Sequence, residues 1–545
     1  MNEITADSTV SRRTGTIGPS PGPSPGPSIK ICLIRPSIVV PRHNITTMFT
    51  PPLGLAYVAG TLQDAGYEVD VIDAVGESLD TRHPYDNDCF LYGLSPEQTV
   101  ERIDAGCTII GVAAGFSFEW PPCRELVASI RERFPDALLI GGGEHITAMP
   151  DQSLSESELD IGVLGEGEET VLALVKSYAS GKLDPAAIEG IVYKSKDGTV
   201  STNPRRPRTR QIDAIPWPAW NLLPIEAYLE RGYGFGINRG RSMPVMASRG
   251  CPYQCTFCSN PQMWTTRWIA RDADLLLDEL EHYQREYGAE NFDFYDLTAI
   301  VKKSWIVDFC RKIKQRDLTF TWQLPSGTRS EAIDHEVAQL LFESGCRNLS
   351  YSPESGSPAV LKRIKKRITT DAVLASIKSS YRAGLNVKCN IMLGFPGETY
   401  KEVRESLGFA MRMAIAGAYD LSIWAFSPYP GSELFDEIYQ EGGIKLDNAY
   451  YDSLRSYADA SMTKSYSEHF SDRNLKIMRI FGLCLFYGTA WFYRPWRPFK
   501  ILYNLYRGKQ ESRAEMGIAN VLRRNRLGSV AAEQPARQTE HQSAC

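Results

Sequence analysis

The chain has 545 residues, enough for two or three domains, and its 60 Lys and Arg against 65 Asp and Glu give a formal net charge of −5 at pH 7. This mild charge, with no long basic tract, argues against a general binder of nucleic acids or other polyanions. Hydrophobic residues make up 43% and charged residues 23%, as in ordinary soluble globular proteins. Twelve cysteines are too few for a disulfide scaffold of this length, so we expect the isolated ones to be small buried side chains in a reducing compartment.

Both ends of the chain have the composition of disordered tails. Residues 1–28 are rich in Ser, Thr, Gly and Pro and cannot bury a core, and residues 530–545 have a similar character. The first residues lack a basic segment followed by an apolar core, so we expect no signal peptide and a cytoplasmic protein.

Residues 29–185 alternate between strand and helix patterns. We expect strands at 29–34, 67–72, 108–113, 137–140 and 161–164, and helices at 53–65, 98–105, 124–133 and 168–178. This alternation predicts a doubly wound parallel sheet of the Rossmann or flavodoxin-like type, whose ligands bind beyond the carboxyl ends of the strands. Two glycine-bearing loops, 141–145 and 165–168, fall at such ends. Glycine lets backbone approach a ligand closely, but tight turns need it as well, so both interpretations stay open.

Residues 186–242 are expected to form a linker between two domains. Within it, we expect the basic cluster at 204–208 to be a solvated loop and the Trp-Pro segment at 215–220 to pack between the domains. A second alternating series fills residues 243–440, with expected strands near 244–247, 292–295, 320–324, 348–351, 388–393 and 421–426. These six strand–helix units predict a partial (β/α)6 barrel in an α/β protein.

Three cysteines, Cys251, Cys255 and Cys258, come directly after the first strand of this series. Thiolates favour iron–sulfur clusters or zinc, but a closed structural zinc site takes four ligands, and no fourth Cys or His lies near in the sequence. A cubane cluster with three protein ligands leaves one iron open. That iron can chelate the amino and carboxylate groups of S-adenosylmethionine, and an electron from the cluster then breaks the sulfonium bond.

This CxxxCxxC spacing resembles the radical S-adenosylmethionine (SAM) superfamily, which places the motif after the first barrel strand and an aromatic residue, here Phe257, before the third cysteine. The resemblance implies a [4Fe-4S] cluster on the three cysteines, with SAM bound beside it. A zinc knuckle is the structural alternative.

Other segments match the same superfamily. Glu354 and Ser355 end the fourth strand, where the family's acidic residue contacts SAM, and a plain carboxylate at a helix N-terminus is the alternative. Gly394 and Gly397 lie in a segment, 392–398, that resembles the family's glycine-rich turn beside the cofactor. Asp296 ends the second strand and is a further candidate for the barrel mouth, where β/α-barrel chemistry takes place.

A doubly wound domain directly before such a barrel resembles the cobalamin-binding subfamily, and segments 51–60, 66–70 and 141–145 carry that resemblance. It implies that Gly141, Gly142, Gly143 and His145 contact cobalamin. One departure is clear, because no histidine lies in the Asp-x-His-x-x-Gly motif that supplies a lower cobalt ligand in many corrinoid domains. We therefore expect cobalt without a protein imidazole and His145 as part of the loop lining, with cobalt coordination by His145 as the alternative.

Residues 441–529 are expected to be mainly helical. They contain an uncharged run at 480–493, shorter than the ~20 residues needed to span a bilayer, and basic and aromatic residues flank it. A helix packed on the barrel and a helix lying in a membrane interface both fit this pattern, so peripheral membrane contact stays open.

The combined resemblance implies a cobalamin-dependent radical SAM enzyme, most simply a methyltransferase that acts on an unactivated carbon of a hydrophobic small molecule. An electron donor such as flavodoxin or ferredoxin would be its protein partner, and no nucleic acid is expected. The motifs bind the cofactors of a radical step that the methyltransferases and other members of the family share, so they do not distinguish the reactions. An oxidative cyclase resembling the anaerobic magnesium-protoporphyrin monomethyl ester cyclase, or another rearrangement of a tetrapyrrole or lipid, is therefore the alternative.

Two further classes fit less well. The tRNA methylthiotransferases carry extra N-terminal cluster cysteines and a small terminal β-domain, and neither is evident in this sequence. A corrinoid- or redox-responsive binding protein without turnover would not need the complete cysteine motif together with the strand-end segments 351–357, 392–398 and 427–432.

Overall fold

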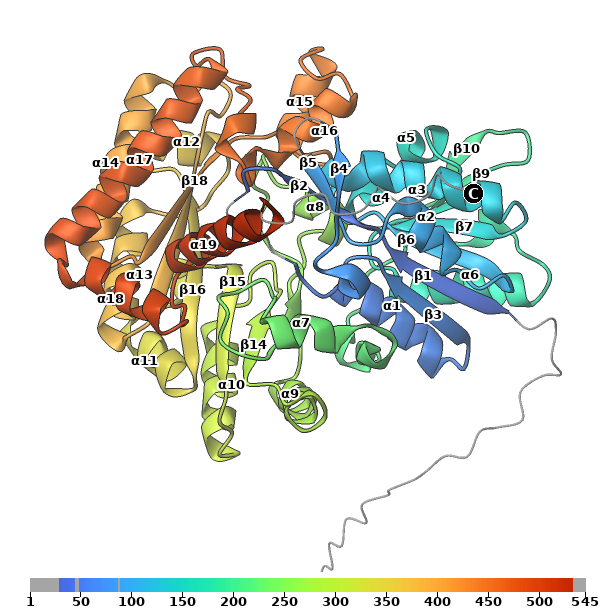
Figure 1. Cartoon of the computed structure of the whole chain (residues 1–545), viewed down its shortest axis with the longest axis horizontal. Coiled ribbons are helices and arrows are strands. Elements are labelled where there is room, and N and C mark those ends of the chain that lie inside the picture. The colour runs from blue at the N-terminus through green and yellow to red at the C-terminus, as the bar shows by residue number, and fades with distance from the viewer. Residues whose placement is uncertain (1–28, 45–48, 87–88, 533–545) are drawn as a thin grey trace, which may run out of the picture.

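The computed structural model describes residues 29–44, 49–86 and 89–532 (Figure 1). The expected tail at 1–28 lies outside these residues, and of the expected tail at 530–545 only 530–532 are described, as the end of the last helix. Figure 1 shows two α/β domains side by side, the N-terminal one in blue and cyan and the second mainly in yellow and orange.

The N-terminal domain is built on a seven-stranded sheet with the order β10-β9-β8-β7-β6-β1-β3. The five strands from β8 to β3 are parallel, and β9 pairs antiparallel with both β8 and β10. Their bounds are β1 (Lys30–Arg35), β3 (Glu68–Asp73), β6 (Cys107–Ala113), β7 (Leu138–Gly142), β8 (Ile161–Val163), β9 (Ile191–Lys194) and β10 (Val200–Thr202). The predicted doubly wound parallel sheet is confirmed.

Helices cover both faces of this sheet, as burial of both faces of a parallel sheet requires. On one face, Ile31 and Leu33 of β1 share a core with α1 (Leu53–Asp64) and α6 (Glu168–Ala179). On the other face, Cys32 and Ile34 pack with α3 (Trp120–Arg133). The remaining helices of the domain are α2 (Pro96–Glu101), α4 (Glu144–Ala148) and α5 (Pro150–Ser155).

Two features differ from the sequence expectation. The segment 186–242, expected as a linker, contributes β9 and β10 to the first sheet before it reaches α7 (Ile225–Arg231). A small antiparallel sheet also forms from β2 (Ile38–Pro41), β5 (Cys89–Tyr92) and β4 (Arg82–Tyr85). These strands have three or four residues, too few for hydrophobic periodicity to distinguish them from loops.

The second domain has six parallel strands in the order β11-β14-β15-β16-β17-β18, with β11 and β18 at the edges. Their bounds are β11 (Ser242–Val245), β14 (Asn291–Phe294), β15 (Thr321–Thr328), β16 (Cys346–Glu354), β17 (Asn386–Leu393) and β18 (Asp420–Ala425). The helices of the domain are α9 (Ala273–Tyr287), α10 (Lys303–Gln315), α11 (His335–Glu343), α12 (Pro358–Arg363), α13 (Thr370–Ala383), α14 (Tyr400–Ala416) and α15 (Glu433–Gln440). The predicted partial (β/α)6 barrel is confirmed.

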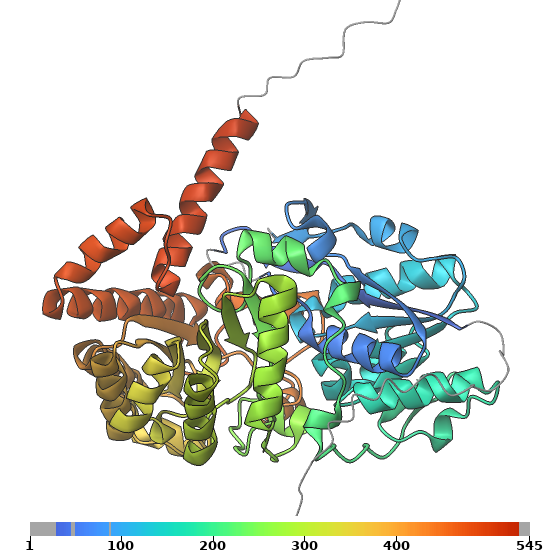
Figure 2. The same cartoon turned by 90° about the horizontal axis from the view of Figure 1, so that it is seen from below.

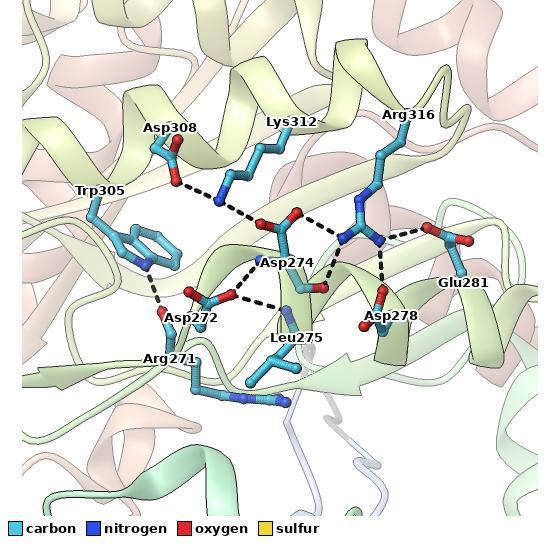
Figure 3. A network of polar contacts seen from close by, with 10 residues as sticks. All are labelled: Arg271, Asp272, Asp274, Leu275, Asp278, Glu281, Trp305, Asp308, Lys312 and Arg316. Carbon is cyan, nitrogen blue, oxygen red and sulfur yellow. Dashed lines mark hydrogen bonds and ion pairs between the residues drawn. The ribbon is translucent and has the colours of Figure 1, made fainter. Parts of the chain in front are cut away.

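Surface ion pairs join the outer helices α9 and α10 (Figure 3). Lys312 bonds Asp274 at 2.7 Å, and Arg316 bonds Asp274, Asp278 and Glu281 at 2.7, 2.7 and 2.9 Å. Exposed pairs of this kind contribute little each. The apolar inner faces of the two helices, which share the barrel core, therefore hold them in place.

The C-terminal region is helical, as expected, with α16 (Asn448–Ser453), α17 (Asp472–Tyr493), α18 (Trp496–Tyr506) and α19 (Arg513–Ala532). Leu475, Phe486 and Ala490 of α17 are buried in the barrel core. Among the described residues, α17 is the only helix long and apolar enough by composition to cross a membrane, and 28% of its apolar window is buried. Figure 2 shows the C-terminal helices on the side of the molecule away from the blue domain, with α19 projecting from the body.

Candidate active site

The three cysteines lie on a loop, hereafter the cluster loop, between β12 (Ser248–Arg249) and α8 (Asn260–Trp264). Gly250 has a φ of +86°, and a Cβ there would stand 2.2 Å from the carbonyl oxygen of Arg267, so only glycine fits at the loop entry. Within the loop, the Thr256 N–H donates to the carbonyl of Ile364 at 3.2 Å, and the Thr256 carbonyl accepts from the N–H of Leu434 at 2.9 Å. These bonds fasten the loop to segments that follow β16 and β18.

Two cations lie against the cluster loop. The Arg329 guanidinium is 3.9 Å from the ring centroid of Tyr253, and the ammonium of Lys366 is 5.9 Å from the ring centroid of Phe257. Both cations also act electrostatically on the thiols of Cys251 and Cys255, so they lie near these two cysteines.

The thiols themselves are partly exposed. Burial raises the pKa of Cys251 and Cys255, a rise that Lys366 and Arg329 oppose, and burial raises the pKa of Cys258 to about 12. Iron binds the thiolate form of cysteine. The two cations therefore offset part of the negative charge that three thiolates would place on the loop. Within the described residues, no three His, Cys, Asp or Glu side chains converge on one ion position.

Glu354 lies at the end of β16 with a φ of +68°, a strained conformation for a residue other than glycine. Its carboxylate accepts a bond from Lys366 at 3.1 Å, and burial raises its pKa while Lys366 opposes that rise. The hydrogen-bond partner is thus a cation beside the cluster loop rather than the N-terminus of a helix. Ser355 has a different role, because its buried hydroxyl bonds that of Ser406 on α14 at 3.0 Å.

The predicted glycine-rich turn follows β17. Gly394 and Gly397 both have positive φ angles, of +87° and +67°. Glu398 shapes the turn by accepting from the N–H of Gly394 at 2.6 Å and of Phe395 at 3.2 Å, and burial raises its pKa to about 7. The ring of Phe395 lies 5.7 Å from that of Phe257, so the turn contacts the cluster loop.

The glycines at 141–143 lie at the carboxyl end of β7, as predicted, but their surroundings differ. A Cβ on Gly141 would stand 2.5 Å from Leu159, and one on Gly143 would stand 2.3 Å from the carbonyl oxygen of Ala114, so close packing explains both. A Cβ on Gly142 would meet nothing nearer than 3.8 Å, and one on Gly115, after β6, would meet nothing within 4 Å. These two positions leave open space against the backbone, which suits a bulky ligand such as cobalamin.

Glu144, the next residue, joins this loop to the cluster loop. Its Oε1 accepts a hydrogen bond from the hydroxyl of Ser259, directly after Cys258. Burial raises the pKa of Glu144, and the bond from Ser259 opposes that rise. The carboxyl end of the first sheet therefore contacts the cysteine motif of the second domain.

His145 is fully buried and stacks on Trp120 with ring centroids 4.6 Å apart. Its Nδ1 lies 3.0 Å from the hydroxyl of Ser117, its Nε2 has no partner among the described residues, and burial lowers its pKa to about 3. The ring of Tyr451 meets the His145 ring edge-on, with ring centroids 5.9 Å apart. His145 thus lies in a core contact between the N-terminal domain and the C-terminal region, apart from the open space at Gly142.

The second predicted loop, 165–168, forms buried ion pairs with the segment just before Cys251. Arg249 bonds Glu166 at 3.1 Å and Glu168 at 2.6 Å, and Arg208 bonds Glu166 at 3.1 Å. These bonds hold the two domains together. Breaking a buried pair of this kind typically costs several kcal/mol.

In the segment 186–242 the structure corrects the expectation for the basic cluster and confirms the one for the Trp-Pro segment. Arg208 of the basic cluster at 204–208 is buried and donates to the carbonyls of Trp264 and Arg267, so the expectation of a solvated loop is wrong there. The Trp-Pro segment packs between the domains as predicted. The Ala219 N–H bonds the Ala56 carbonyl of α1 at 2.9 Å, and Trp220 donates to Tyr283 of α9 at 3.1 Å.

Asp296 does not face an open barrel mouth, contrary to the expectation. It is buried and accepts from the Ala247 N–H at 3.0 Å and from the Ser248 hydroxyl at 2.5 Å. Burial raises its pKa to about 6. Asp296 therefore fixes the strand that leads into the cluster loop.

Sequence reasoning missed Glu119, which ends the 3₁₀ helix η2 (Ser117–Glu119) after β6. Burial raises its pKa to about 7, and the guanidinium groups of Arg35 and Arg455 oppose that rise. Its carboxylate accepts no hydrogen bond from any residue that the structure describes. The rule that ligands bind beyond strand ends could have indicated this carboxylate.

Two family models match the chain, the B12 binding domain over residues 46–175 and the Radical SAM superfamily over residues 245–410. Cytidylyl-2-hydroxyethylphosphonate methyltransferase of Streptomyces wedmorensis is 30% identical over 454 residues, which cover 77% of this chain and 84% of that protein. The anaerobic magnesium-protoporphyrin IX monomethyl ester cyclase of Rubrivivax gelatinosus is 28% identical over 399 residues, 71% of this chain and 66% of that protein. The solved structure of the radical SAM methyltransferase TsrM of Kitasatospora setae, with cobalamin and a [4Fe-4S] cluster bound, gives a TM-score of 0.59 at 20% identity and covers 76% of this chain and 78% of that one.

These matches show that the chain belongs to the radical SAM superfamily, in the group that carries a B12-binding domain. It is a cobalamin-dependent radical enzyme whose cofactors are a [4Fe-4S] cluster, SAM and cobalamin. The family inferred from the motifs is confirmed. The donor set fits these groups, since three free cysteines share one loop beside two cations and open glycine positions lie at the first sheet's carboxyl end.

Proposed function

We propose that this enzyme is a C-methyltransferase that acts on a hydrophobic small molecule. The observation that carries the proposal is the bond from Ser259 to Glu144, which joins the cluster loop to the strand-end loop of the B12-binding domain. The two surfaces that suit the cofactors therefore meet at one site, as a reaction that uses both cofactors on one substrate requires. A methyltransferase relative at 30% identity supports the same conclusion.

When bound, the cluster supplies the electron that cleaves SAM, and cobalamin carries a methyl group. We assign the cluster to Cys251, Cys255 and Cys258. Glu354 and the turn from Gly394 to Gly397 then form walls of the SAM site, because both contact the surroundings of Phe257.

On the facing domain, Gly142 and Gly115 leave room for cobalamin. Glu119 follows Gly115 in the segment after β6, and burial raises its pKa to about 7, so it can hold or release a proton near neutral pH. We assign no cobalt-ligand role to His145, because its ring is enclosed by Trp120 and Tyr451.

Aromatic side chains near Glu119 support a hydrophobic substrate. Phe116 is 52% exposed and stacks on Phe118 with ring centroids 5.4 Å apart. Phe118 in turn lies 5.6 Å from Tyr457 of the C-terminal region. An apolar substrate would bury this exposed ring and gain the free energy of its removal from water.

A second surface suits the electron donor. A cavity of about 650 Å³ lies beside the cluster loop. It is lined by residues of that loop and by basic residues in and after α12, among them Pro252, Tyr253, Gln254, Lys362, Lys365 and Arg367. We propose that an acidic flavodoxin or ferredoxin docks there in the cytoplasm, because complementary charge speeds and orients such encounters.

The test is an anaerobic reaction of the reconstituted enzyme with methyl-labelled SAM, dithionite and an organic-solvent extract of cells that produce the protein. Label in an organic product, with S-adenosylhomocysteine and 5′-deoxyadenosine formed alongside, supports methyl transfer. An oxidised or cyclised product without label would overturn it in favour of the cyclase alternative, which the cyclase relative supports.

A further inference from the structure

The helices α17 and α18 turn their apolar side chains outward. On α18 the exposed residues recur three and four apart, so they share one face of the helix. The outward-facing apolar residues of the two helices, hereafter the outer face, are Ile477, Ile480, Phe481, Trp491, Phe492, Tyr493, Trp496, Phe499, Leu502, Tyr503 and Tyr506. Phe499 is 72% exposed, Phe492 81% and Tyr506 88%. Single exposed apolar residues are ordinary, but a set of large ones on two consecutive helices marks an interaction surface.

The inner side of the same helices carries charge. Arg494 is buried and donates to the carbonyls of Ala414 and Ile415 at 2.9 and 3.0 Å. Arg497 is buried and donates to the carbonyls of Ala418 and Gly417 at 2.7 and 2.8 Å.

These carbonyls lie at and just beyond the C-terminus of α14, where backbone acceptors lack helical partners. A third buried arginine, Arg479 of α17, donates to the carbonyls of Ile423 and Ser456. The inner sides of α17 and α18 thus hold buried arginines as well as apolar residues, while large apolar residues also face outward. The arginines fix the rotation of α17 and α18, so the outer face cannot turn inward without leaving several backbone carbonyls and three guanidinium groups unsatisfied.

Charge around the outer face favours an anionic partner. Between residues 472 and 510 the sequence has one acidic residue, Asp472, in a chain that is acidic as a whole. Exposed Arg473 stands near one end of this segment, and exposed Arg507 and Lys509 stand at the other. Tryptophan and tyrosine beside basic residues are the combination that membrane interfaces select.

A second copy of the chain fits this surface less well. Two copies related by a two-fold axis would place the same patch against itself and bring the basic groups of one copy near those of the other. An anionic bilayer instead offers negative headgroups to the basic residues and an apolar layer to the aromatic rings.

A surface contact is also favoured over a membrane crossing. Leu475, Phe486 and Ala490 of α17 are packed in the barrel core, and Arg479 is bonded inside the fold. A crossing would have to pull this inner side away from α14 and β18. Figure 2 shows these helices together at one side of the molecule.

We propose that the outer face of α17 and α18 docks the folded enzyme on the surface of an anionic membrane. This contact is independent of the chemistry at the cluster loop. It would bring the enzyme to the compartment in which apolar molecules concentrate.

The test is flotation of the full-length protein with vesicles of phosphatidylcholine mixed with phosphatidylglycerol, against vesicles of phosphatidylcholine alone. We expect flotation with the anionic vesicles that weakens in high salt. A variant combining Phe492→Ser, Phe499→Ser and Tyr506→Ser should lose binding by about tenfold or more. The matched control combines Leu275→Ser, Phe342→Ser and Tyr439→Ser, which change exposed apolar residues on other helices, and it should float like the native protein.

Both variants should still form 5′-deoxyadenosine from SAM with dithionite, which shows that the fold and the cluster are intact. Failure of the native protein to float with anionic vesicles would overturn the proposal. A vesicle-free dimer, seen by sedimentation velocity and abolished in the outer-face variant, would overturn it as well, because the surface would then bind a second copy. Neither result depends on the product of the reaction, so the methyl-transfer proposal is tested separately.

Discussion

Glu144 accepts a hydrogen bond from the hydroxyl of Ser259, and this bond joins the loop after β7 of one domain to the cluster loop of the other. The same interface holds Arg249, whose guanidinium bonds Glu166 and Glu168. Two polar contacts therefore hold the B12-binding domain against the cysteine motif. In each, a residue at the carboxyl end of a strand of the first sheet reaches a residue within two positions of a cluster cysteine.

Glu144→Ala should reduce methyl transfer more than SAM cleavage. The substitution removes the bond to Ser259 and leaves the three cysteines unchanged. SAM cleavage needs only the barrel, whereas methyl transfer needs the two domains held in their native relative position. We expect about a tenfold loss of labelled product at nearly unchanged 5′-deoxyadenosine release, since small misplacements of reacting groups cost that much. Glu169→Ala, an exposed acid on α6, is the control. An equal loss of both products would show that Glu144 acts on the barrel itself.

Cys255→Ala should abolish both the cluster and SAM cleavage. The alanine removes one of three thiolates on a loop that has no spare cysteine, so bound iron and sulfide should fall to background after anaerobic reconstitution, with loss of the visible absorbance of the cluster. Cys484→Ala, which changes an exposed cysteine on α17, should leave iron content unchanged. Stoichiometric zinc in the native protein, with no iron after reconstitution, would favour the zinc alternative.

The features that the sequence predicted well are local. Cys251, Cys255 and Cys258 lie within eight residues, so their spacing can be recognised without a fold. The barrel strands are similar, because each is a run of buried residues bounded by polar turns and its signal lies in its own residues. Gly394 and Gly397 lie in a short segment that resembles the family's glycine-rich turn, and both have the positive φ angles of a tight turn.

The features that were missed depend on distant parts of the chain. The guanidinium of Arg455 donates to the carbonyl of Phe118, 337 residues away, and so lies near Glu119. Asp296 was placed at an open mouth, but it is covered because Ser248 and Ala247 fold back onto it. Whether a polar side chain is exposed or buried depends on packing between distant segments, and a local sequence pattern carries no information about that packing.

Lys366→Met should weaken SAM binding and raise its KM. The substitution removes the cation that bonds Glu354 and lies beside Phe257, so a buried carboxylate loses its partner. Leaving one charge of a buried pair alone costs about 3–5 kcal/mol, so the thermal midpoint should fall too. Lys366→Arg should restore part of the SAM affinity. Lys378→Met, an exposed lysine on α13, should change neither quantity. A native KM for SAM in Lys366→Met would exclude this site assignment.

Glu119 should make the stability of the cofactor-free protein depend on pH. Burial raises its pKa from 4.5 to about 7 in the folded chain, so the unfolded chain releases the proton first as pH rises. Below about pH 4.5 the group is protonated in both states and has no effect. Between about pH 4.5 and 7 the ionisation of Glu119 should lower the free energy of unfolding as pH rises. Above that range the free energy of unfolding stays lower by about 1–3 kcal/mol.

Glu119→Gln keeps the shape of the side chain and cannot ionise, so it should be more stable than the native protein at about pH 8 and nearly equal to it at about pH 4.5. Urea unfolding of the two cofactor-free proteins at several pH values measures this difference. Glu101→Gln, an exposed carboxylate in α2, should show no such trend. Destabilisation by Glu119→Gln at about pH 8 would contradict this prediction. The ionised carboxylate would then form a buried ion pair with Arg35 and Arg455. In that case Glu119 would join the two domains rather than hold a proton at the site.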